Sequence, residues 1–258
     1  MLTARQKREQ AYYDEYANTY KQDVEVAFGP IEGRERRPWN PYWYLFGRVK
    51  DAYRPGARLL DFGCGWGENA VVFAKIGYDV QGFDLSGANL QAARRLADRY
   101  GLGSRMHLSR QAAEGLAYAD GAFDVVVGVD ILHHVDIPRA IRECHRVLKP
   151  GGLAFFKEPV TNWLFDTVRN LGLVKKLRPN SVSFDRHVTE DERKLNGADL
   201  KTIRRIFTKM DVMRFRVISR LDALLPGAMM LLEKVDYWCS ILPGYARLRG
   251  TVILCLRK

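Results

Sequence analysis

Three glycines at alternate positions, in the stretch Gly63-Cys64-Gly65-Trp66-Gly67, lie between two aspartates, Asp61 and Asp84. Glycine lets a backbone approach a ligand where a Cβ would collide, and free N–H groups at the start of a helix can hold a polar group. Asp84 stands where an acid accepts ribose hydroxyls in nucleotide-binding folds, and Asp61 where an acid can meet a cationic amino group. The spacing is G-x-G-x-G and not the G-x-G-x-x-G of dinucleotide binders, although an NAD-binding enzyme stays an alternative.

Two adjacent histidines, His133 and His134, closely follow the strongly apolar stretch 123–129, and Glu158 follows the next apolar stretch. Imidazole titrates near neutral pH, so a histidine is a natural base for a hydroxyl that must lose its proton. These three residues are therefore candidate catalytic groups. Histidines that only cap a loop, and a carboxylate that is only solvated, are the alternatives. His187, in a basic stretch, could swing over the same site.

Strands and helices alternate along the middle of the chain, which predicts βαβ units and a parallel sheet. Short apolar stretches predict strands over 58–62, 79–83, 105–109, 123–129, 153–156, 213–219 and 251–256. Apolar residues spaced three and four apart, together with helix start and stop signals, predict helices over 69–76, 87–100, 138–148 and 199–207. The expected fold is α/β, a doubly wound, mostly parallel seven-stranded sheet with helices on both faces. Its ligand would bind at the carboxyl ends of the strands.

Three segments of a single domain are expected around that sheet. Residues 1–57 form an N-terminal helical and aromatic lid, residues 58–158 the cofactor-binding core, and residues 159–258 complete the sheet with helical insertions on the acceptor side. In the first segment, tyrosines recur at helical spacing (Tyr12, Tyr13, Tyr16 and Tyr20), and the stretch 38–44 is aromatic enough to line an acceptor pocket. Ordinary packing against the domain is the alternative for both.

The chain has 258 residues and a formal net charge of +11, of which residues 159–258 carry +9. The excess charge therefore lies outside the expected cofactor-binding core. No apolar stretch reaches the length of a membrane-spanning helix, and the basic start lacks a signal-peptide pattern. The four cysteines form no CxxC pair, so neither a metal site nor a disulfide is expected. A cytoplasmic, reduced protein is the default expectation.

Five motifs in a fixed order make the sequence resemble a known family. They read LLDFGCGWGENAVVFA, GFDLS, AAEGLAY, DGAFDVVVGVDILHHV and RVLKPGG, and together they cover about residues 58–158. Each motif is common by itself, but their order and spacing resemble those of class I S-adenosylmethionine-dependent methyltransferases. The resemblance implies that S-adenosylmethionine is the cofactor and that the reaction is methyl transfer.

The resemblance also implies a role for each matching residue. The amino and carboxylate groups of the cofactor's methionine would be held by the first loop, and the ribose and adenine by the second strand end and by a later loop. The backbone at the end of the fourth strand would also contact the methionine portion. These cofactor-binding residues are Asp61, Gly63, Gly65, Gly67, Asp84, Leu85, Ala113, Glu114, Gly128 and Val129. Ala112 stands where many relatives carry an aspartate that accepts from the adenine amino group, which leaves adenine recognition to Glu114 or to the backbone.

The expected function is methyl transfer to a small, partly apolar acceptor, with an oxygen nucleophile, in-line displacement and histidine-assisted deprotonation. A lipid or lipid-linked acceptor at a membrane surface is the main alternative, because apolar stretches in 221–232 and 237–248 lie among basic residues. That alternative would make the protein membrane-peripheral through its basic C-terminal region. An RNA methyltransferase is a further alternative, while no DNA partner is expected and a homodimer stays open.

Overall fold

The computed structural model describes residues 2–20, 24–33, 35–161, 193–215, 227–239, 242, 244–245 and 250–258. The expected basic insertion, with His187, lies for the most part outside the described residues. So do large parts of the two C-terminal apolar stretches.

The described residues form one mixed sheet of seven strands. The strands are β1 (Arg58–Phe62), β2 (Asp79–Asp84), β3 (Met106–Arg110), β4 (Phe123–Val129), β5 (Leu148–Pro159), β6 (Lys209–Phe215) and β7 (Thr251–Arg257). Their order is β3-β2-β1-β4-β5-β7-β6. The first five strands are mutually parallel, and β7 runs antiparallel to β5 and β6. The doubly wound, mostly parallel sheet expected from the sequence is confirmed.

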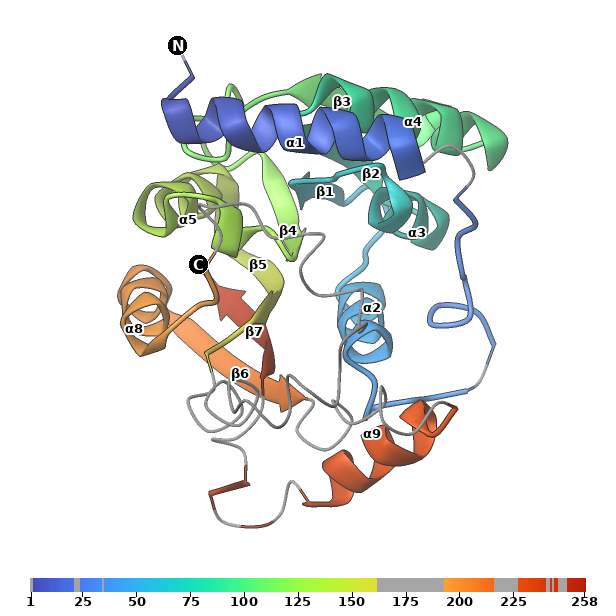
Figure 1. Ribbon diagram of the computed structural model, residues 1–258, viewed down its shortest axis with the longest axis vertical. Coiled ribbons are helices and arrows are strands. Elements are labelled where there is room, and N and C mark those ends of the chain that lie inside the picture. Colours follow the sequence, from blue (N-terminus) through green and yellow to red (C-terminus); the bar gives the residue numbers. More distant parts are fainter. Residues whose placement is uncertain are drawn as a thin grey trace, which may run out of the picture.

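Helices cover both faces of the sheet (Figure 1). They are α1 (Ala4–Tyr20), α2 (Pro41–Asp51), α3 (Glu68–Ile76), α4 (Gly87–Arg99), α5 (Ile137–Val147), α8 (Gly197–Ile206) and α9 (Met229–Trp238), with short 3-10 turns η1 (Gly103–Arg105) and η2 (Leu132–His134). One buried apolar cluster includes Ile141 and Ile203 of α5 and α8, and a second includes Leu45 and Val71 of α2 and α3. Burial of these two layers removes apolar side chains from water and stabilises the fold.

The strand expected over 213–219 is wrongly placed. Strand β6 begins at Lys209 and ends at Phe215. Its residues alternate in burial, with Met210 buried and Asp211 exposed, as in an edge strand with one solvated face. A search for apolar stretches misses the polar half of such a strand. Strand β5, Leu148–Pro159, is longer than the strand expected over 153–156.

The aromatic stretch 38–44 leads into a helix that the sequence reasoning did not anticipate. The side chain of Asn40 accepts hydrogen bonds from the backbone N–H groups of Tyr42 and Trp43, and Pro41 occupies the first turn. Both features are typical of a helix start. Helix α2 buries Leu45 against the sheet, so this stretch has a structural role as well as an aromatic surface.

The order of the strands decides where a ligand can bind. Strands β2 and β3 lie in turn on one side of β1, and β4 and β5 lie in turn on its other side, so the strand order reverses at β1. Open sheets of this kind bind ligands at the carboxyl ends of the strands on either side of the reversal. Helix α1 runs along α4 across this part of the molecule (Figure 1).

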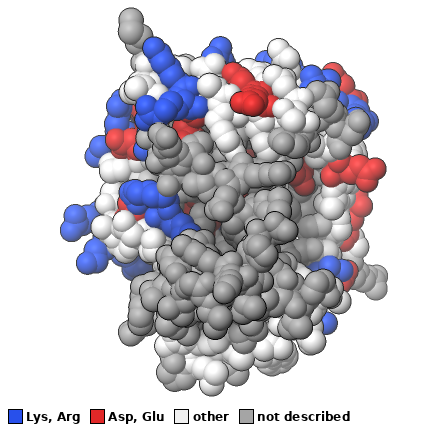
Figure 2. Space-filling model, in the orientation of Figure 1, with Lys and Arg blue, Asp and Glu red and all other residues white. Residues whose placement is uncertain are grey.

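Charged side chains are unevenly distributed over the surface. Figure 2 shows Lys and Arg mainly on the side where α5 and α8 lie, with Asp and Glu toward the opposite side. Helix α8 contributes Arg204 and Arg205 in its last turn. Part of the basic excess of the C-terminal segment therefore lies on the β6–β7 side of the sheet, away from the glycine loop.

Candidate active site

The glycine loop between β1 and α3 has a backbone that only glycine adopts easily. Gly63, Gly65 and Gly67 have φ values of +77°, +51° and +87°. A Cβ on Gly63 would lie 2.6 Å from the side chain of Ile131, and one on Gly67 would lie 2.7 Å from Ala93. A Cβ on Gly65 would meet nothing within 4 Å. Two of the glycines therefore permit close packing, whereas Gly65 faces open space that a ligand can approach.

Asp84 ends β2 and organises the loop beside it. Its carboxylate accepts hydrogen bonds from the backbone N–H of Gly65 (3.0 Å), the backbone N–H of Ser86 (2.8 Å) and the side-chain amide of Asn89 (3.3 Å). Burial raises the pKa of Asp84, while these three donors oppose that rise. A carboxylate offers about four lone-pair positions, so capacity remains for one further donor such as a ribose hydroxyl.

Asp84→Ala should weaken S-adenosylmethionine binding by about 1.5–3 kcal/mol, because a charged hydrogen-bond acceptor is lost. It should also lower the stability of the free protein, since the N–H groups of Gly65 and Ser86 lose their acceptor. Titration calorimetry measures the affinity for S-adenosylmethionine, and thermal unfolding measures the stability of the free protein. Asp79→Ala, at the other end of the same strand, is the matched control and should leave the affinity unchanged. Unchanged affinity in Asp84→Ala would refute the ribose role.

Asp61 is buried beside this loop with an unsatisfied oxygen. The residue is 1% exposed, and its Oδ2 has no hydrogen-bond partner among the described residues. Burial, and then the nearby charge of Asp84, raise the pKa of Asp61 to about 8. Leaving a buried carboxylate unpaired is unfavourable, and an ammonium group would satisfy it. The methionine amino group of S-adenosylmethionine has the required charge, so the residues present fit this cofactor.

The residues expected at the adenine lie close to β2 and α5. Leu85 follows β2 and is half-buried, and Ala113 is buried in the core. The carboxylate of Glu114 accepts from the side-chain amide of Gln6 at 2.8 Å and from the backbone N–H of Asp136 at 3.0 Å. Glu114 therefore joins helix α1 to the start of α5 at this edge of the site.

The end of β4 places the next pair of expected residues. Gly128 lies opposite Phe156 of β5, and a Cβ on it would lie 2.5 Å from the Phe156 ring. Val129, the last residue of the strand, pairs with Lys157. Gly128 is thus needed for packing between strands, while Val129 leads directly into the loop that carries the histidines.

His133 and Glu158 form a buried pair. The His133 Nδ1 lies 2.7 Å from Glu158 Oε2, and Glu158 Oε1 accepts from the backbone N–H groups of Ile131 and Leu132. Because a carboxylate can only accept, Glu158 favours the imidazole tautomer that carries its hydrogen on Nδ1. Nε2 is then the atom that can take a proton, the arrangement used by carboxylate–histidine pairs in catalysis.

His134 is held instead by helix α1. Its Nδ1 lies 3.1 Å from the Glu9 carboxylate, and its Nε2 lies 3.1 Å from the Tyr13 hydroxyl. Both ring nitrogens thus face residues of α1. The two histidines therefore differ, because His133 is oriented from within the sheet and His134 from the covering helix.

Helix α1 makes further contacts around the site. Asp14 accepts from the Ser86 hydroxyl at 2.6 Å and from the backbone N–H of Ala88 at 3.0 Å, at the start of α4. A carboxylate at a helix N-terminus is favourable because it satisfies free N–H groups. The ring of Tyr16 lies 6.1 Å from that of Trp66 in the glycine loop. No local pattern marks Asp14 as part of the site, which is why sequence reasoning missed it.

A second feature that sequence reasoning missed is an ion pair at the ends of β4 and β5. Lys157 Nζ lies 2.5 Å from Asp130 Oδ2. Asp130 directly follows β4, the same signal that singled out the histidines. Nothing in the sequence marks Lys157 as part of this site, because its partner can be identified only when the pairing of β4 with β5 is known.

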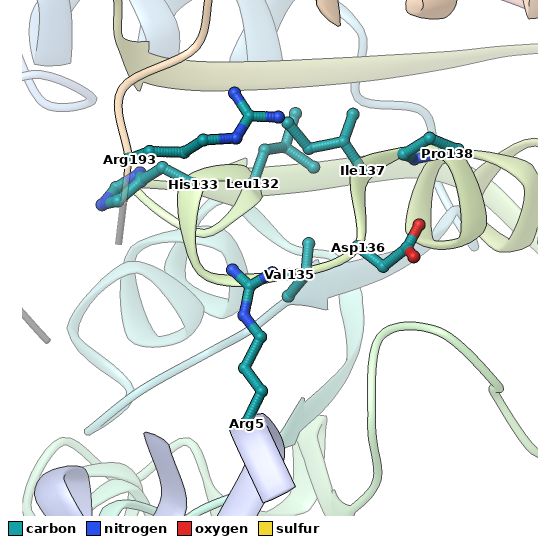
Figure 3. A pocket seen from close by; sticks show the side chains of 8 residues that line it. All are labelled: Arg5, Leu132, His133, Val135, Asp136, Ile137, Pro138 and Arg193. Atoms are coloured by element: carbon teal, nitrogen blue, oxygen red, sulfur yellow. The ribbon is translucent and has the colours of Figure 1, made fainter. Parts of the chain in front are cut away.

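A pocket of about 200 Å³ opens beside His133 (Figure 3). Its walls combine apolar side chains with two guanidinium groups, and the lining residues are Arg5, Leu132, His133, Val135, Asp136, Ile137, Pro138 and Arg193. Figure 3 shows the Arg5 side chain pointing from α1 toward Val135, while the Arg193 guanidinium lies beyond Leu132. The guanidinium of Arg193 is held by two hydrogen bonds to Asp199, at 2.6 and 2.8 Å.

Comparison with known protein families agrees with this geometry. The family described as "Methyltransferase domain" matches residues 60–156, which span β1 through most of β5. Residues 60–156 are therefore a methyltransferase domain. The cofactor of such domains is S-adenosylmethionine. Asp61 and the glycine loop of this domain fit that ligand.

Curated relatives resemble the methyltransferase domain and little else of the chain. A ubiquinone biosynthesis O-methyltransferase of Chelativorans sp. (strain BNC1) is 38% identical over 113 residues, which are 43% of this chain and 44% of that protein. One of Cereibacter sphaeroides (strain ATCC 17025 / ATH 2.4.3) is 41% identical over 99 residues, or 38% and 39% of the two chains. The chain thus matches less than half the length of these relatives.

Solved structures extend the similarity beyond the methyltransferase domain. The [4+2]-cyclase SpnF has a TM-score of 0.62 and 26% identity, covering 100% of this chain and 97% of that one. Geranyl diphosphate C-methyltransferase from Streptomyces coelicolor A3(2) has a TM-score of 0.64 at 14% identity, covering 99% and 98%. The second likeness shows the fold alone.

Proposed function

We propose that the protein transfers a methyl group from S-adenosylmethionine to a hydroxyl oxygen of a small, partly apolar acceptor. The observation that carries the proposal is the unsatisfied, buried Asp61 carboxylate beside the open space at Gly65. This pair of features suits a ligand with an ammonium group close to a backbone-bound carboxylate. The curated relatives, named as O-methyltransferases, support oxygen as the methylated atom.

The chain's own residues have three tasks in such a reaction. S-adenosylmethionine, when bound, would supply a methyl group on a sulfonium sulfur that can leave with the bonding electron pair. Asp61 and Asp84 fix the methyl donor, so that the acceptor oxygen can approach in line. His133 Nε2 takes the hydroxyl proton as the O–C bond forms, and Glu158 stabilises the imidazolium at Nδ1. Helix α1 covers the site and excludes water.

The pocket beside His133 supports a small acceptor. A volume of about 200 Å³ holds a ring or a short chain. The accessible lining is mostly polar, with Arg5 suited to an acidic substituent, and its smaller apolar part suits the apolar part of the acceptor. An acceptor in this pocket lies next to the imidazole that would take its proton.

The experiment that tests the proposal combines cofactor binding with an acceptor search. Calorimetry with S-adenosylmethionine should show saturable binding, and an extract incubated with protein and methyl-labelled cofactor should yield a labelled small molecule. Binding of nicotinamide dinucleotide without S-adenosylmethionine binding would overturn the cofactor assignment. Cofactor binding without label transfer would instead favour another reaction on this fold, as the name of the cyclase SpnF illustrates.

A lipid acceptor is a second candidate, favoured by helix α9. Met230, Leu231 and Trp238 are 51%, 64% and 69% exposed on this helix. Within the described part of the chain, no helix has the length and apolarity needed to cross a membrane. An exposed apolar helix face with a tryptophan suits the interface of a bilayer instead.

Vesicle sedimentation tests that second candidate. We expect the protein to sediment with vesicles of anionic phospholipid at low salt, and Leu231→Glu with Trp238→Glu to abolish sedimentation. Arg204→Glu on α8 serves as a charge-matched control away from α9. A wild-type protein that stays in the supernatant would remove the membrane-surface candidate.

A further inference from the structure

Helices α5 and α8 share a strongly basic outer surface. The two helices pack against each other through buried apolar side chains, among them Ile141 and Ile203. Their exposed basic residues, which we call the α5–α8 basic face, are Arg139, Arg142, Lys201, Arg204 and Arg205. Spacings of three and four residues place these side chains on one side of each helix. The two helices lie on the side of the molecule where Figure 2 shows most of the Lys and Arg side chains.

The charge of this face is not neutralised within the described part of the chain. Glu143 of α5 is paired with Arg146 at 2.8 Å. Asp199 of α8 is likewise paired with Arg193 at 2.6 Å. The side chains of the α5–α8 basic face form no ion pair among the described residues. Like charges on neighbouring helices repel one another and lower the stability of the folded protein. A negatively charged partner would remove this repulsion, so the face suits association.

The pocket beside His133 adjoins this face. Asp136 and Pro138, which line the pocket, belong to the start of α5. Arg193, also in the lining, precedes α8 and is bound to Asp199 of that helix. At about 200 Å³ the pocket holds only a small group. Whatever is attached to that group must therefore lie outside the pocket, beside the starts of α5 and α8.

The chemistry of the α5–α8 basic face favours an acidic protein over a bilayer or a nucleic acid. In the described ranges, the exposed large apolar side chains lie on β6, on α9 and at Leu242, and none lies on α5 or α8. The face therefore has no apolar side chain to insert into a bilayer. It also lacks an exposed aromatic ring on which a nucleobase could stack. Guanidinium and ammonium groups pair well with carboxylates, so an acidic protein surface is complementary to it.

We propose that the α5–α8 basic face docks an acidic carrier protein, which presents the acceptor to the pocket on a flexible arm. Carboxylates of the carrier pair with the basic face, and the small acceptor group at the end of the arm enters the pocket beside His133. The charge pairing also speeds the encounter of the two proteins. The docking rests on the proposed methyl transfer and adds how the acceptor arrives, as a small group joined covalently to a protein.

Binding of a bacterial acyl carrier protein, a small acidic protein with such an arm, tests the docking. Fluorescence anisotropy of the labelled carrier should show saturable binding to the full chain, which added salt weakens. Arg142→Glu with Arg204→Glu should weaken binding at least about tenfold, because like charges then face the carrier. Lys201→Glu with Arg205→Glu should give the same loss, which guards against a folding defect in one variant. Arg54→Glu with Arg95→Glu, exposed residues before β1 and on α4, changes the net charge equally and should keep the affinity.

Cofactor affinity separates this proposal from the proposed function. All the charge-reversal variants should bind S-adenosylmethionine as the wild type does, because Asp61 and Asp84 are intact. A wild type that binds S-adenosylmethionine but not the carrier, or an equal loss of carrier binding in the control variant, would overturn the docking alone. Carrier binding without S-adenosylmethionine binding would overturn the proposed function instead.

Two further measurements bear on the kind of partner. In the extract with methyl-labelled cofactor, the labelled small molecule should be recovered from the protein fraction after mild alkali, and label on free molecules only would refute the carrier. Anionic phospholipid vesicles and polyuridine RNA are the competing probes. If either binds more tightly than the carrier and loses binding in Arg142→Glu with Arg204→Glu, the face belongs to a membrane or to RNA, and the carrier proposal fails.

Discussion

Glu158→Gln should lower the turnover number about 10²–10⁴-fold, the usual contribution of a general base. The glutamine oxygen can still accept from the N–H groups of Ile131 and Leu132. Its amide nitrogen, however, would face His133 Nδ1 and donate to it. The imidazole hydrogen would then move to Nε2, the atom that must take the acceptor's proton. The substitution therefore removes the base without removing the ring.

Single-turnover measurements with labelled cofactor check this expectation, and calorimetry checks that cofactor affinity is preserved. The double variant Glu158→Gln/His133→Ala should be no slower than His133→Ala alone, because residues that act as one unit are not additive. His134→Ala should retain most of the activity, since its nitrogens contact α1. Full turnover in Glu158→Gln would mean that His133 is not the base.

Asp61→Asn should weaken S-adenosylmethionine binding by about 1.5–3 kcal/mol, roughly 10–150-fold, while it stabilises the free protein at alkaline pH. The loss of affinity follows because asparagine cannot pair with the cofactor's ammonium group. The gain in stability follows because asparagine removes a buried carboxylate that has no hydrogen-bond partner on Oδ2 among the described residues. Opposite effects on binding and stability are the signature of a residue kept for function.

The pH dependence of this effect has a definite sign. The pKa of Asp61 is about 8 in the folded protein, against an ordinary value of 3.8. Between these values the folded state binds more protons at Asp61 than the unfolded state, so the residue lowers stability as the pH rises, by about 1.4 kcal/mol per pH unit. The advantage of Asp61→Asn should therefore be small near pH 4 and largest at pH 8 and above. Cofactor affinity of the wild type should increase over the same range.

Asp124 gives a control of opposite sign. Burial acts to raise its pKa, but hydrogen bonds from Lys149 and Arg58 outweigh burial and lower it. Its ionised form stabilises the folded protein above the unfolded pKa, and that contribution is lost as the pH falls through the lowered folded pKa. Asp124→Asn should thus reduce the melting temperature at pH 8, with no change in cofactor affinity. A lower melting temperature for Asp61→Asn at pH 8 would contradict the assignment.

The cofactor half of the site could be read from the sequence because it is local. Asp61, the glycines and the start of α3 are contiguous, and Asp84 ends the next strand along the chain. Alternating strands and helices fix which ends of the strands come together, so these residues had to meet. The structure places them side by side, with Asp84 bound to Gly65.

The other contacts around the site could not be predicted in the same way, because they join distant segments of the chain. In the sequence Lys157 resembles any strand residue, because the pairing of β4 with β5 is not known there. Tyr42 lies on helix α2, which the aromatic composition of its first residues made hard to predict. Asp14 reaches the start of α4 only because α1 docks there. Tertiary packing decides these positions, and no periodic pattern encodes which distant residue will be the partner.

The contacts of helix α1 with the site are mostly polar. Gln6, Asp14 and Tyr13 bind Glu114, Ser86 and His134 through hydrogen bonds that water can replace on opening. A cover held in this way exchanges protein hydrogen bonds for solvent ones at little net free energy. We therefore expect the helix to open and close in each catalytic cycle, so that product leaves through the gap that α1 opens.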